Sequence, residues 1–260
     1  MSYETARLIT DDNYQDFLRQ QSDAGMVGFG ALPRQTQPGG IMGVPMMAEK
    51  VPLIPESEWP DRIRYMTENK LWIGDRWQSD PQADYQNGFG FCWAYSLSQA
   101  VMAVRAAQGQ PFVQLSPESL AEDVNYRNAG NYLDLALAYA AKNGIATRAT
   151  VPQHKIKESQ WDAAYKQERT IYIPSEWWDL DGRDVWQSTV TALLLGYGCY
   201  VGLDWWSHAV WYDRMRISDR GAIEIHTPNS HGPGEDVWLS QSKATPGMGS
   251  FVLRTVTWHE

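Results

Sequence analysis

Between about residues 90 and 195, apolar residues recur every three to four positions, the spacing of one buried face of an α-helix. The longest run begins at Cys92 and ends near Gln108, where the following glycine is a typical helix stop. Another helix is expected to begin at Ser116, a good cap that is followed by proline. Further helices are expected over Asp11–Gln21, Asn131–Asn143, Asp162–Arg169 and Asp184–Leu195.

The period changes after residue 198, where Val, Ile, Tyr and Trp gather in short runs that are typical of strands. These runs are Cys199–Asp204, Ala209–Arg216, Ala222–Thr227 and Phe251–Thr257. Helices first and strands later predict an α+β chain with two lobes. We expect the helical lobe to cover about residues 86–195 and the strand-rich lobe about 196–260.

The composition describes an ordinary globular chain and narrows its partners. The sequence has 260 residues, 43% of them hydrophobic and 20% charged, enough to bury a substantial core. Its net charge of −9 argues against nucleic acid or an anionic membrane as the main partner. We see no signal peptide and no run of about 20 apolar residues. A cytoplasmic location or a place in a larger particle is therefore expected.

The candidate chemistry centres on Cys92, because it stands at the start of the longest predicted helix. Free N–H groups and the helix dipole stabilise a thiolate at that position, and the thiolate is the nucleophilic form of cysteine. Gln86, six residues upstream, can donate its amide to a negative oxygen beside the sulfur. The alternative is a buried structural cysteine or a disulfide with Cys199, although we expect Cys199 to lie in a buried strand.

Downstream residues offer the other parts of a nucleophilic site. His208 can act as a base towards Cys92, and Asn229 can hold the orientation of the imidazole. Each also has a plain structural interpretation, as a buried histidine and as a turn asparagine. The chain also contains 13 Trp and 13 Tyr, which either pack the core or bind a substrate. The histidines and acidic residues show no metal-ligand spacing, so no metal site is expected.

The segment around Cys92 resembles the signature of the papain-like cysteine peptidases, in which Gln is followed six residues later by Cys-Trp-Ala and an aromatic residue. Phe89 stands where most of that family has a first cysteine. Further matches occur in the family's order up to about Trp238, over half of the chain. They are Leu115–Leu120, Asn128-Ala129-Gly130, Asn143-Gly144-Ile145, His208-Ala209-Val210 and Asn229-Ser230-His231-Gly232.

The resemblance implies a papain-like two-lobed fold, with the cysteine on the helical lobe and the histidine and asparagine on an antiparallel β-barrel-like lobe. It implies catalytic roles for Cys92, His208, Asn229 and Gln86, the last forming the oxyanion hole with the backbone N–H of the cysteine. Substrate-binding roles are expected for Ala129, Gly130 and Trp206. A peptide or protein substrate and no cofactor are expected. His231 departs from the family's tryptophan, which shields the His–Asn bond, and Trp205, Trp206 or Trp238 can substitute for it.

Residues 1–60 differ from the rest and are predicted to form an extended N-terminal arm, with the papain-like domain over 61–260. The run from Gly39 to Met47 is apolar and rich in Gly, Pro and Met, without a helical or strand period. Such a segment gains stability only by burying its apolar side chains. The surface against which the segment packs is the chain's own lobes, a neighbouring subunit or the active-site cleft. An arm is favoured over an inhibitory prosegment, because we find no match to the helical prosegments of the family.

Two other functions remain open. Transglutaminase-like and peptidoglycan amidase enzymes also pair Cys with His, but lack a glutamine six residues before the cysteine, so Gln86 favours the papain type. A papain-fold protein recruited as a structural or binding component of a larger assembly, for example a viral particle, is the alternative from another class. The His231 departure and the apolar arm are both compatible with it.

Overall fold

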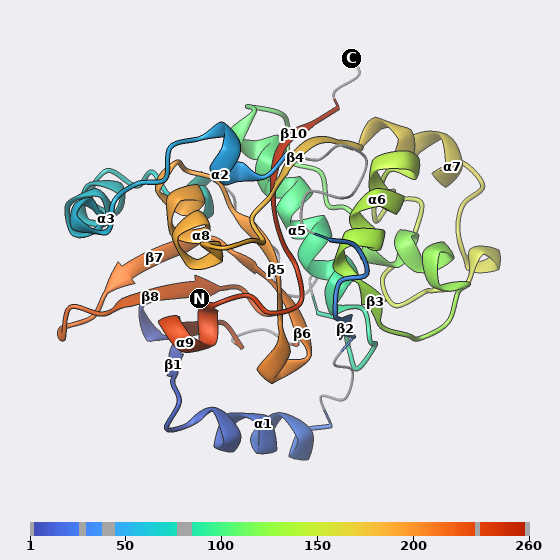
Figure 1. Cartoon of the computed structure of the whole chain (residues 1–260). Coiled ribbons are helices and arrows are strands. Elements are labelled where there is room, and N and C mark those ends of the chain that lie inside the picture. The colour runs from blue at the N-terminus through green and yellow to red at the C-terminus, as the bar shows by residue number, and fades with distance from the viewer. Residues whose placement is uncertain (1–2, 26–29, 38–44, 77–84, 232–234, 258–260) are drawn as a thin grey trace.

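The computed structural model describes residues 3–25, 30–37, 45–76, 85–231 and 235–257 (Figure 1). Its α-helices are α1 (Tyr14–Asp23), α2 (Met47–Lys50), α3 (Trp59–Glu68), α4 (Ile73–Arg76), α5 (Cys92–Ala107), α6 (Leu133–Asn143), α7 (Tyr165–Glu168), α8 (Val185–Leu194) and α9 (Gln241–Ala244). Its 3₁₀ helices are η1 (Tyr3–Thr5), η2 (Glu56–Glu58), η3 (Pro117–Val124), η4 (Glu158–Gln160), η5 (Arg169–Ile171) and η6 (Asp204–Trp206). Its strands are β1 (Arg7–Ile9), β2 (Ala31–Leu32), β3 (Asn131–Tyr132), β4 (Pro174–Asp179), β5 (Cys199–Leu203), β6 (His208–Tyr212), β7 (Arg214–Ile217), β8 (Ile223–Thr227), β9 (Val237–Ser240) and β10 (Ser250–Val256).

Helix α5 runs through the middle of the molecule, between the other helices of one lobe and the sheets of the other (Figure 1). Every residue from Cys92 to Arg105 is buried, so the helix is covered on all sides. A helix that is apolar nearly all round belongs in a core, and its partners here are α6, η3 and the sheet that contains β5, β6 and β10. The first turn of α5 therefore lies where the two lobes meet.

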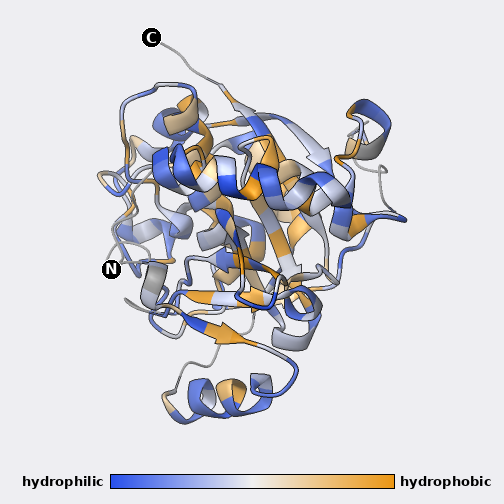
Figure 2. Cartoon of the chain, turned by 90° about the vertical axis from the view of Figure 1, so that its left-hand side faces the viewer, coloured by the Kyte–Doolittle hydropathy of each residue, from blue (hydrophilic) through white to orange (hydrophobic). Residues whose placement is uncertain are grey.

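Two four-stranded sheets make up the second lobe, in the orders β1-β9-β8-β7 and β4-β10-β5-β6. Alternate residues of the second sheet enter different cores, as expected from the two-residue period of a strand. Tyr200 and Phe251 join the core around α5, whereas their neighbours Val201 and Val252 join a core with α3 and α8. In Figure 2 the hydrophobic colour concentrates on the central elements, while α1 is mostly hydrophilic.

Most predicted elements are confirmed, and two differ from the prediction. The predicted helix that starts at Cys92 is α5, and the runs at Cys199, Ala222 and Phe251 are β5, β8 and β10. The run Ala209–Arg216 instead forms two strands in different sheets, β6 and β7. The chain changes sheets at Asp213, whose carboxylate holds His226 Nδ1 at 2.6 Å and Arg214 Nε at 3.0 Å. Helix α8, expected in the helical lobe, packs with the second core.

The described parts of residues 1–60 pack onto the rest of the chain. Strand β1 pairs in parallel with β9 at the edge of a sheet, and β2 pairs in parallel with β3. Helix α1 lies at the lower end of the molecule in Figure 1, and its Phe17 is buried against Trp206. Most of the Gly39–Met47 run lies outside the described residues. None of the described helices is long and apolar enough to cross a lipid bilayer.

Candidate active site

Cys92 is the first residue of α5 and is completely buried. Its Sγ accepts a hydrogen bond from the backbone N–H of Ala209 at 3.3 Å. Burial raises the pKa of the Cys92 thiol to about 11, and hydrogen bonds from the backbone of Ala209, Gly30, Trp93 and Ala31 act against that rise. Burial thus favours the thiol, although several N–H groups converge on the sulfur and would stabilise a thiolate.

His208 opens strand β6 and lies directly before the residue that contacts the Cys92 sulfur. Its Nε2 lies 3.0 Å from Asn229 Oδ1, while its buried Nδ1 has no hydrogen-bond partner among the described residues. The backbone N–H of His231 also donates to Asn229 Oδ1, which identifies that atom as the oxygen. Because an amide oxygen only accepts, Nε2 carries the proton and Nδ1 is the basic atom.

The electrostatics of His208 favour a neutral ring. Burial lowers the pKa of His208 well below its ordinary value, and the neighbouring His231 lowers it further, whereas the bond to Asn229 raises it. No hydrogen bond joins Nδ1 to the Cys92 sulfur in this arrangement. Burial therefore favours the neutral form of both groups, and β6 brings the residue that follows His208 into contact with the Cys92 sulfur.

Gln86 connects the cysteine loop to the asparagine loop. Its backbone N–H donates to Ser230 O at 2.8 Å, and its Oε1 accepts from Ser230 Oγ at 2.5 Å. Its Nε2 donates to the carbonyl of Phe89 at 2.7 Å, which fixes the turn that leads into α5. The Gln86 amide, predicted to donate to an oxyanion, thus donates to the backbone carbonyl of Phe89 in this structure.

The tryptophan substitution noted in the sequence has a counterpart in Trp206. Its ring centroid lies 4.5 Å from that of His208 and 5.9 Å from that of His231, and its side chain is buried. Trp238 instead packs on His226, with ring centroids 5.0 Å apart. Among the three candidates, Trp206 therefore covers the predicted base, and its role in substrate binding stays a prediction.

A segment from the N-terminal region covers Cys92. Gly30 and Ala31 are two of the residues whose backbone bonds to the sulfur, and Ala31 N also donates to Ser207 O at 3.3 Å. On the other side, the N–H of Asn131 donates to Gly30 O at 2.8 Å, which begins the β2–β3 ladder. Part of the N-terminal region, at Gly30 and Ala31, thus packs on the candidate active site itself. No local sequence pattern marks this contact apart from the small residues Gly30 and Ala31.

Two glycines make this approach possible. A Cβ on Gly30 would lie 2.1 Å from the carbonyl oxygen of Gly90, and a Cβ on Gly130 would lie 2.5 Å from the carbonyl oxygen of Gly30. Both distances are far below a van der Waals contact, so neither position admits a side chain. Gly130, predicted to bind substrate, therefore contacts the chain's own backbone, and the carbonyl of the adjacent Ala129 accepts from Trp93 Nε1 at 3.2 Å.

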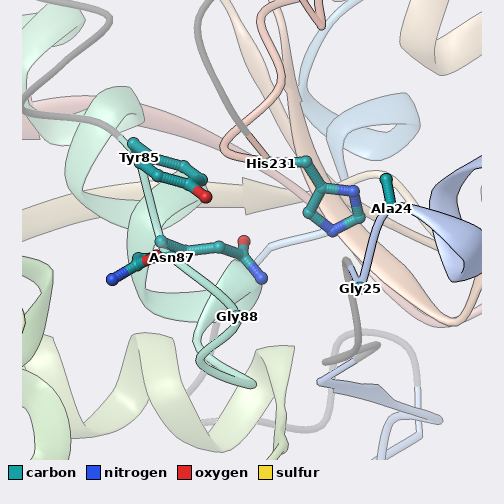
Figure 3. Close-up of a pocket in the computed structure, with 7 residues that line it drawn as sticks. Ala24, Gly25, Tyr85, Asn87, Gly88 and His231 are labelled. Carbon is teal, nitrogen blue, oxygen red and sulfur yellow. The ribbon is translucent and has the colours of Figure 1, made fainter.

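A polar cavity of about 250 Å³ lies beside the loop that leads to Cys92, at Tyr85 to Gly88 (Figure 3). It is lined by Ala24, Gly25, Tyr85, Gln86, Asn87, Gly88 and His231. Tyr85 and His231 lie on opposite sides of it, and Ala24 stands beside His231. The Nδ1 of His231 is bonded to Gln21 Oε1 of α1, so the N-terminal region also closes this side. Within the described part of the chain, no three His, Cys, Asp or Glu side chains gather as metal ligands.

Solved structures with a similar fold exist at low sequence identity. The chain resembles proCathepsin B S9 from Trypanosoma congolense, with a TM-score of 0.61, 12% identity and coverage of 96% of this chain and 99% of that one. It also resembles procathepsin L 3 of the Tenebrio molitor larval midgut, with a TM-score of 0.58, 16% identity and coverage of 95% of this chain and 89% of that one. A third similar structure is xylellain, a cysteine protease from Xylella fastidiosa, with a TM-score of 0.61, 13% identity and coverage of 90% of this chain and 97% of that one. The predicted α+β, papain-like fold is confirmed. No protein-family model and no curated protein matches the sequence.

Proposed function

We propose that this chain is a papain-like cysteine peptidase or amidase that its own N-terminal segment holds in a latent form. The observation that carries the proposal is the orientation of the His208 ring and the position of its proton. Its Nε2–H is held by Asn229 Oδ1, and its basic Nδ1 is left without a hydrogen bond one residue away from the N–H that reaches the Cys92 sulfur. A base that is oriented in this way beside a thiol is the requirement for nucleophilic catalysis.

The reaction follows from these groups. His208 Nδ1 takes the proton of Cys92, and the sulfur attacks the carbonyl carbon of an amide. The negative oxygen that forms is stabilised by the backbone N–H of Cys92 and by the Gln86 amide, once that amide leaves the Phe89 carbonyl. His208 then protonates the departing amine, and a water molecule hydrolyses the thioester. No cofactor is required for any step.

Latency follows from what covers the sulfur. While Gly30 and Ala31 lie on Cys92, no substrate carbonyl can approach it, and burial keeps both the thiol and the imidazole neutral. When the segment leaves, water enters, the cost of charging both groups falls, and the thiolate–imidazolium pair becomes accessible. Two of the similar structures are described as procathepsins and match 96% and 95% of this chain, which supports a comparable role for residues before about 50.

The rival from another class is a papain-fold protein that serves as a structural component of a larger assembly. A fully buried sulfur and an amide donor that is already bonded agree with that function as well. The two proposals differ after the segment is displaced. An enzyme then gains a reactive thiol and hydrolyses peptides, whereas a structural protein gains neither.

The test uses the full chain with Gly30→Val, because any side chain at position 30 collides with the Gly90 carbonyl and displaces the segment. A peptidyl epoxide should label this variant at Cys92, and the variant should cleave peptides from a mixed library. Adding Cys92→Ala should abolish both. If the Gly30→Val protein stays folded, but is neither labelled nor active on any peptide, the structural alternative replaces the enzymatic one.

A further inference from the structure

Arg34 follows Gly30, which lies on the Cys92 sulfur, by four residues in the chain. It occupies a nearly closed acidic site. Its guanidinium donates to both oxygens of Asp179, at 3.1 Å from Nη1 and 2.9 Å from Nη2, and it also pairs with Asp181. Its Cζ lies 5.4 Å from the ring centroid of Phe251. Only 13% of the Arg34 side chain and 2% of the Asp179 side chain are exposed. Bidentate pairing and an aromatic neighbour are the features of a built guanidinium site rather than of a surface ion pair.

The backbone that follows Arg34 is anchored as well. Asp134, fully buried in the first turn of α6, accepts from the N–H of Gln35 at 3.0 Å and of Thr36 at 2.9 Å. The same carboxylate oxygen also accepts the Thr36 hydroxyl at 2.9 Å. The site thus recognises both a basic side chain and the amides of an extended chain next to it. These are the two kinds of group that a peptide substrate also presents.

Displacing the N-terminal segment would leave this site without its cation. Asp179 and Asp181 would then share a buried space, and a buried carboxylate without a positive partner is costly. Burial already raises the pKa of Asp181, against the hydrogen bonds from Ser250 and Arg34 that lower it. A lysine or arginine of another chain would restore the missing charge and the missing hydrogen bonds, and would gain affinity from both.

The position of the site relative to Cys92 indicates which substrate residue would reach it. Arg34 lies four residues from Gly30, and an extended chain advances about 3.3 Å per residue, so the site is at most about 13 Å along the backbone. The cavity is lined by Gly25, which precedes Gly30 in the chain, whereas Arg34 follows Gly30. It is also lined by His231, whose ring centroid is 4.2 Å from that of His208. Since His208 must protonate the leaving amine, the leaving group belongs on the cavity side. The acyl part of the substrate then points towards Asp179.

We propose that Asp179 and Asp181, with Phe251 beside them, form a specificity subsite for an arginine or lysine at the third or fourth residue before the cleaved bond. Arg34 fills this subsite in the latent chain. The inference rests on the proposed function, because it assigns the substrate class of the same site. The clearest consequence is a preference for basic peptides that depends on these two carboxylates and on no other feature of the acidic surface.

The kinetic test removes the internal occupant and compares matched peptides. The parent is the full chain with Gly30→Val and Arg34→Gln, which opens the site and vacates it. Peptides with Arg or Lys at the third or fourth position should exceed their Gln counterparts in kcat/KM by about 10- to 100-fold, the range for a charged hydrogen-bonded pair. Asp179→Asn in this parent should bring the ratio close to one, whereas Asp219→Asn, in the exposed turn between β7 and β8, should leave it unchanged. If Asp179→Asn fails to fold, Asp181→Asn provides the same comparison.

A binding measurement separates failure of this inference from failure of the proposed function. Adding Cys92→Ala to the parent removes hydrolysis, and fluorescence anisotropy then reports the affinity for labelled Arg and Gln peptides. Tighter binding of the Arg peptide by about tenfold or more supports the subsite even if the parent shows no hydrolysis. Equal kcat/KM values and equal affinities for the two peptides would overturn the subsite and leave the enzymatic proposal standing.

Discussion

Gly30 and Gly90 approach each other so closely that a Cβ on Gly30 would lie 2.1 Å from the Gly90 carbonyl oxygen. Gly90 belongs to the turn before Cys92, and Gly30 belongs to the segment that covers it. The covering segment is therefore not a loose flap, because its fit depends on the absence of a single carbon atom. A substitution at position 30 is the smallest change that acts on the segment and leaves α5 and β6 untouched.

We predict that Gly30→Val raises the rate at which a peptidyl epoxide labels Cys92 by at least about tenfold over the unaltered chain. Tenfold corresponds to about 1.4 kcal/mol in the balance between covered and open forms, and a side chain forced into a packed contact typically costs about 1–3 kcal/mol. Mass spectrometry of the labelled protein over time gives the rate. The side chain of Gln35 in the same segment is exposed, so Gln35→Val should label at the original rate. Equal rates for all three proteins would show that the segment does not limit access.

Much of the fold could be predicted from the sequence, because it depends on local periods. Helix α5 follows from apolar residues at helical spacing, and β5 and β10 follow from runs of β-formers. What could not be predicted depends on distant contacts. The strand β1 is formed by pairing with β9, more than 200 residues away. Its three residues are too few to show a strand pattern in the sequence. The change of sheets at Asp213 depends on a bond to His226 that no local rule anticipates.

The candidate site divides in the same way. The identities of Cys92, His208, Asn229 and Gln86 came from an ordered set of short motifs, and the structure brings them to the region where α5 meets β6. The state of the site could not be read from those motifs. Nothing in the chemistry of Gly30 marks it as a partner of Cys92, since a glycine carries no side-chain pattern and acts here through its size. The partners of Gln86, Ser230 and Phe89, likewise depend on tertiary placement.

Gln86→Ala, made in the Gly30→Val chain, should lower kcat by about 10²–10³-fold with little change in KM. The reason is that an oxyanion donor acts mainly on the charge that develops in the transition state. Steady-state hydrolysis of one cleaved library peptide provides both constants. Gln167→Ala, an exposed glutamine on α7, is the matched control and should be silent. A loss confined to KM would assign Gln86 to ground-state binding instead.

Cys199 should be dispensable for activity. It is buried in β5, its sulfur contacts the Thr189 carbonyl at 4.0 Å, and burial raises the pKa of its thiol far above the ordinary value. Both cysteines are free in the structure, so no disulfide connects Cys199 to the candidate nucleophile. Cys199→Ala in the Gly30→Val chain should retain epoxide labelling and hydrolysis, with a modest loss of stability in urea denaturation. Equal inactivation by Cys199→Ala and Cys92→Ala, in proteins that remain folded, would contradict the separation of roles.

Acid should destabilise the folded chain through His231. Burial lowers the pKa of His231 to about 4, whereas an unfolded histidine titrates near about 6.5. As the pH falls below about 6.5, the unfolded chain binds a proton that the folded chain refuses until about pH 4. The free energy of unfolding therefore falls across that window and is unaffected by this group above it. At pH 5 the loss amounts to about 2 kcal/mol from His231, and burial of His208 acts in the same direction.

The measurement compares urea denaturation of the unaltered chain and of His231→Gln at several pH values between 7.5 and 5. Glutamine does not titrate, and its amide N–H can still donate to Gln21 Oε1 of α1, the present partner of the imidazole. Carboxylates elsewhere titrate in both proteins, so their effect cancels in the difference. We expect the unaltered chain to lose about 2 kcal/mol more than the variant between pH 7.5 and pH 5. Parallel curves would mean that His231 accepts a proton in the folded state, and that the region between α1 and His208 is open to water before the segment is displaced.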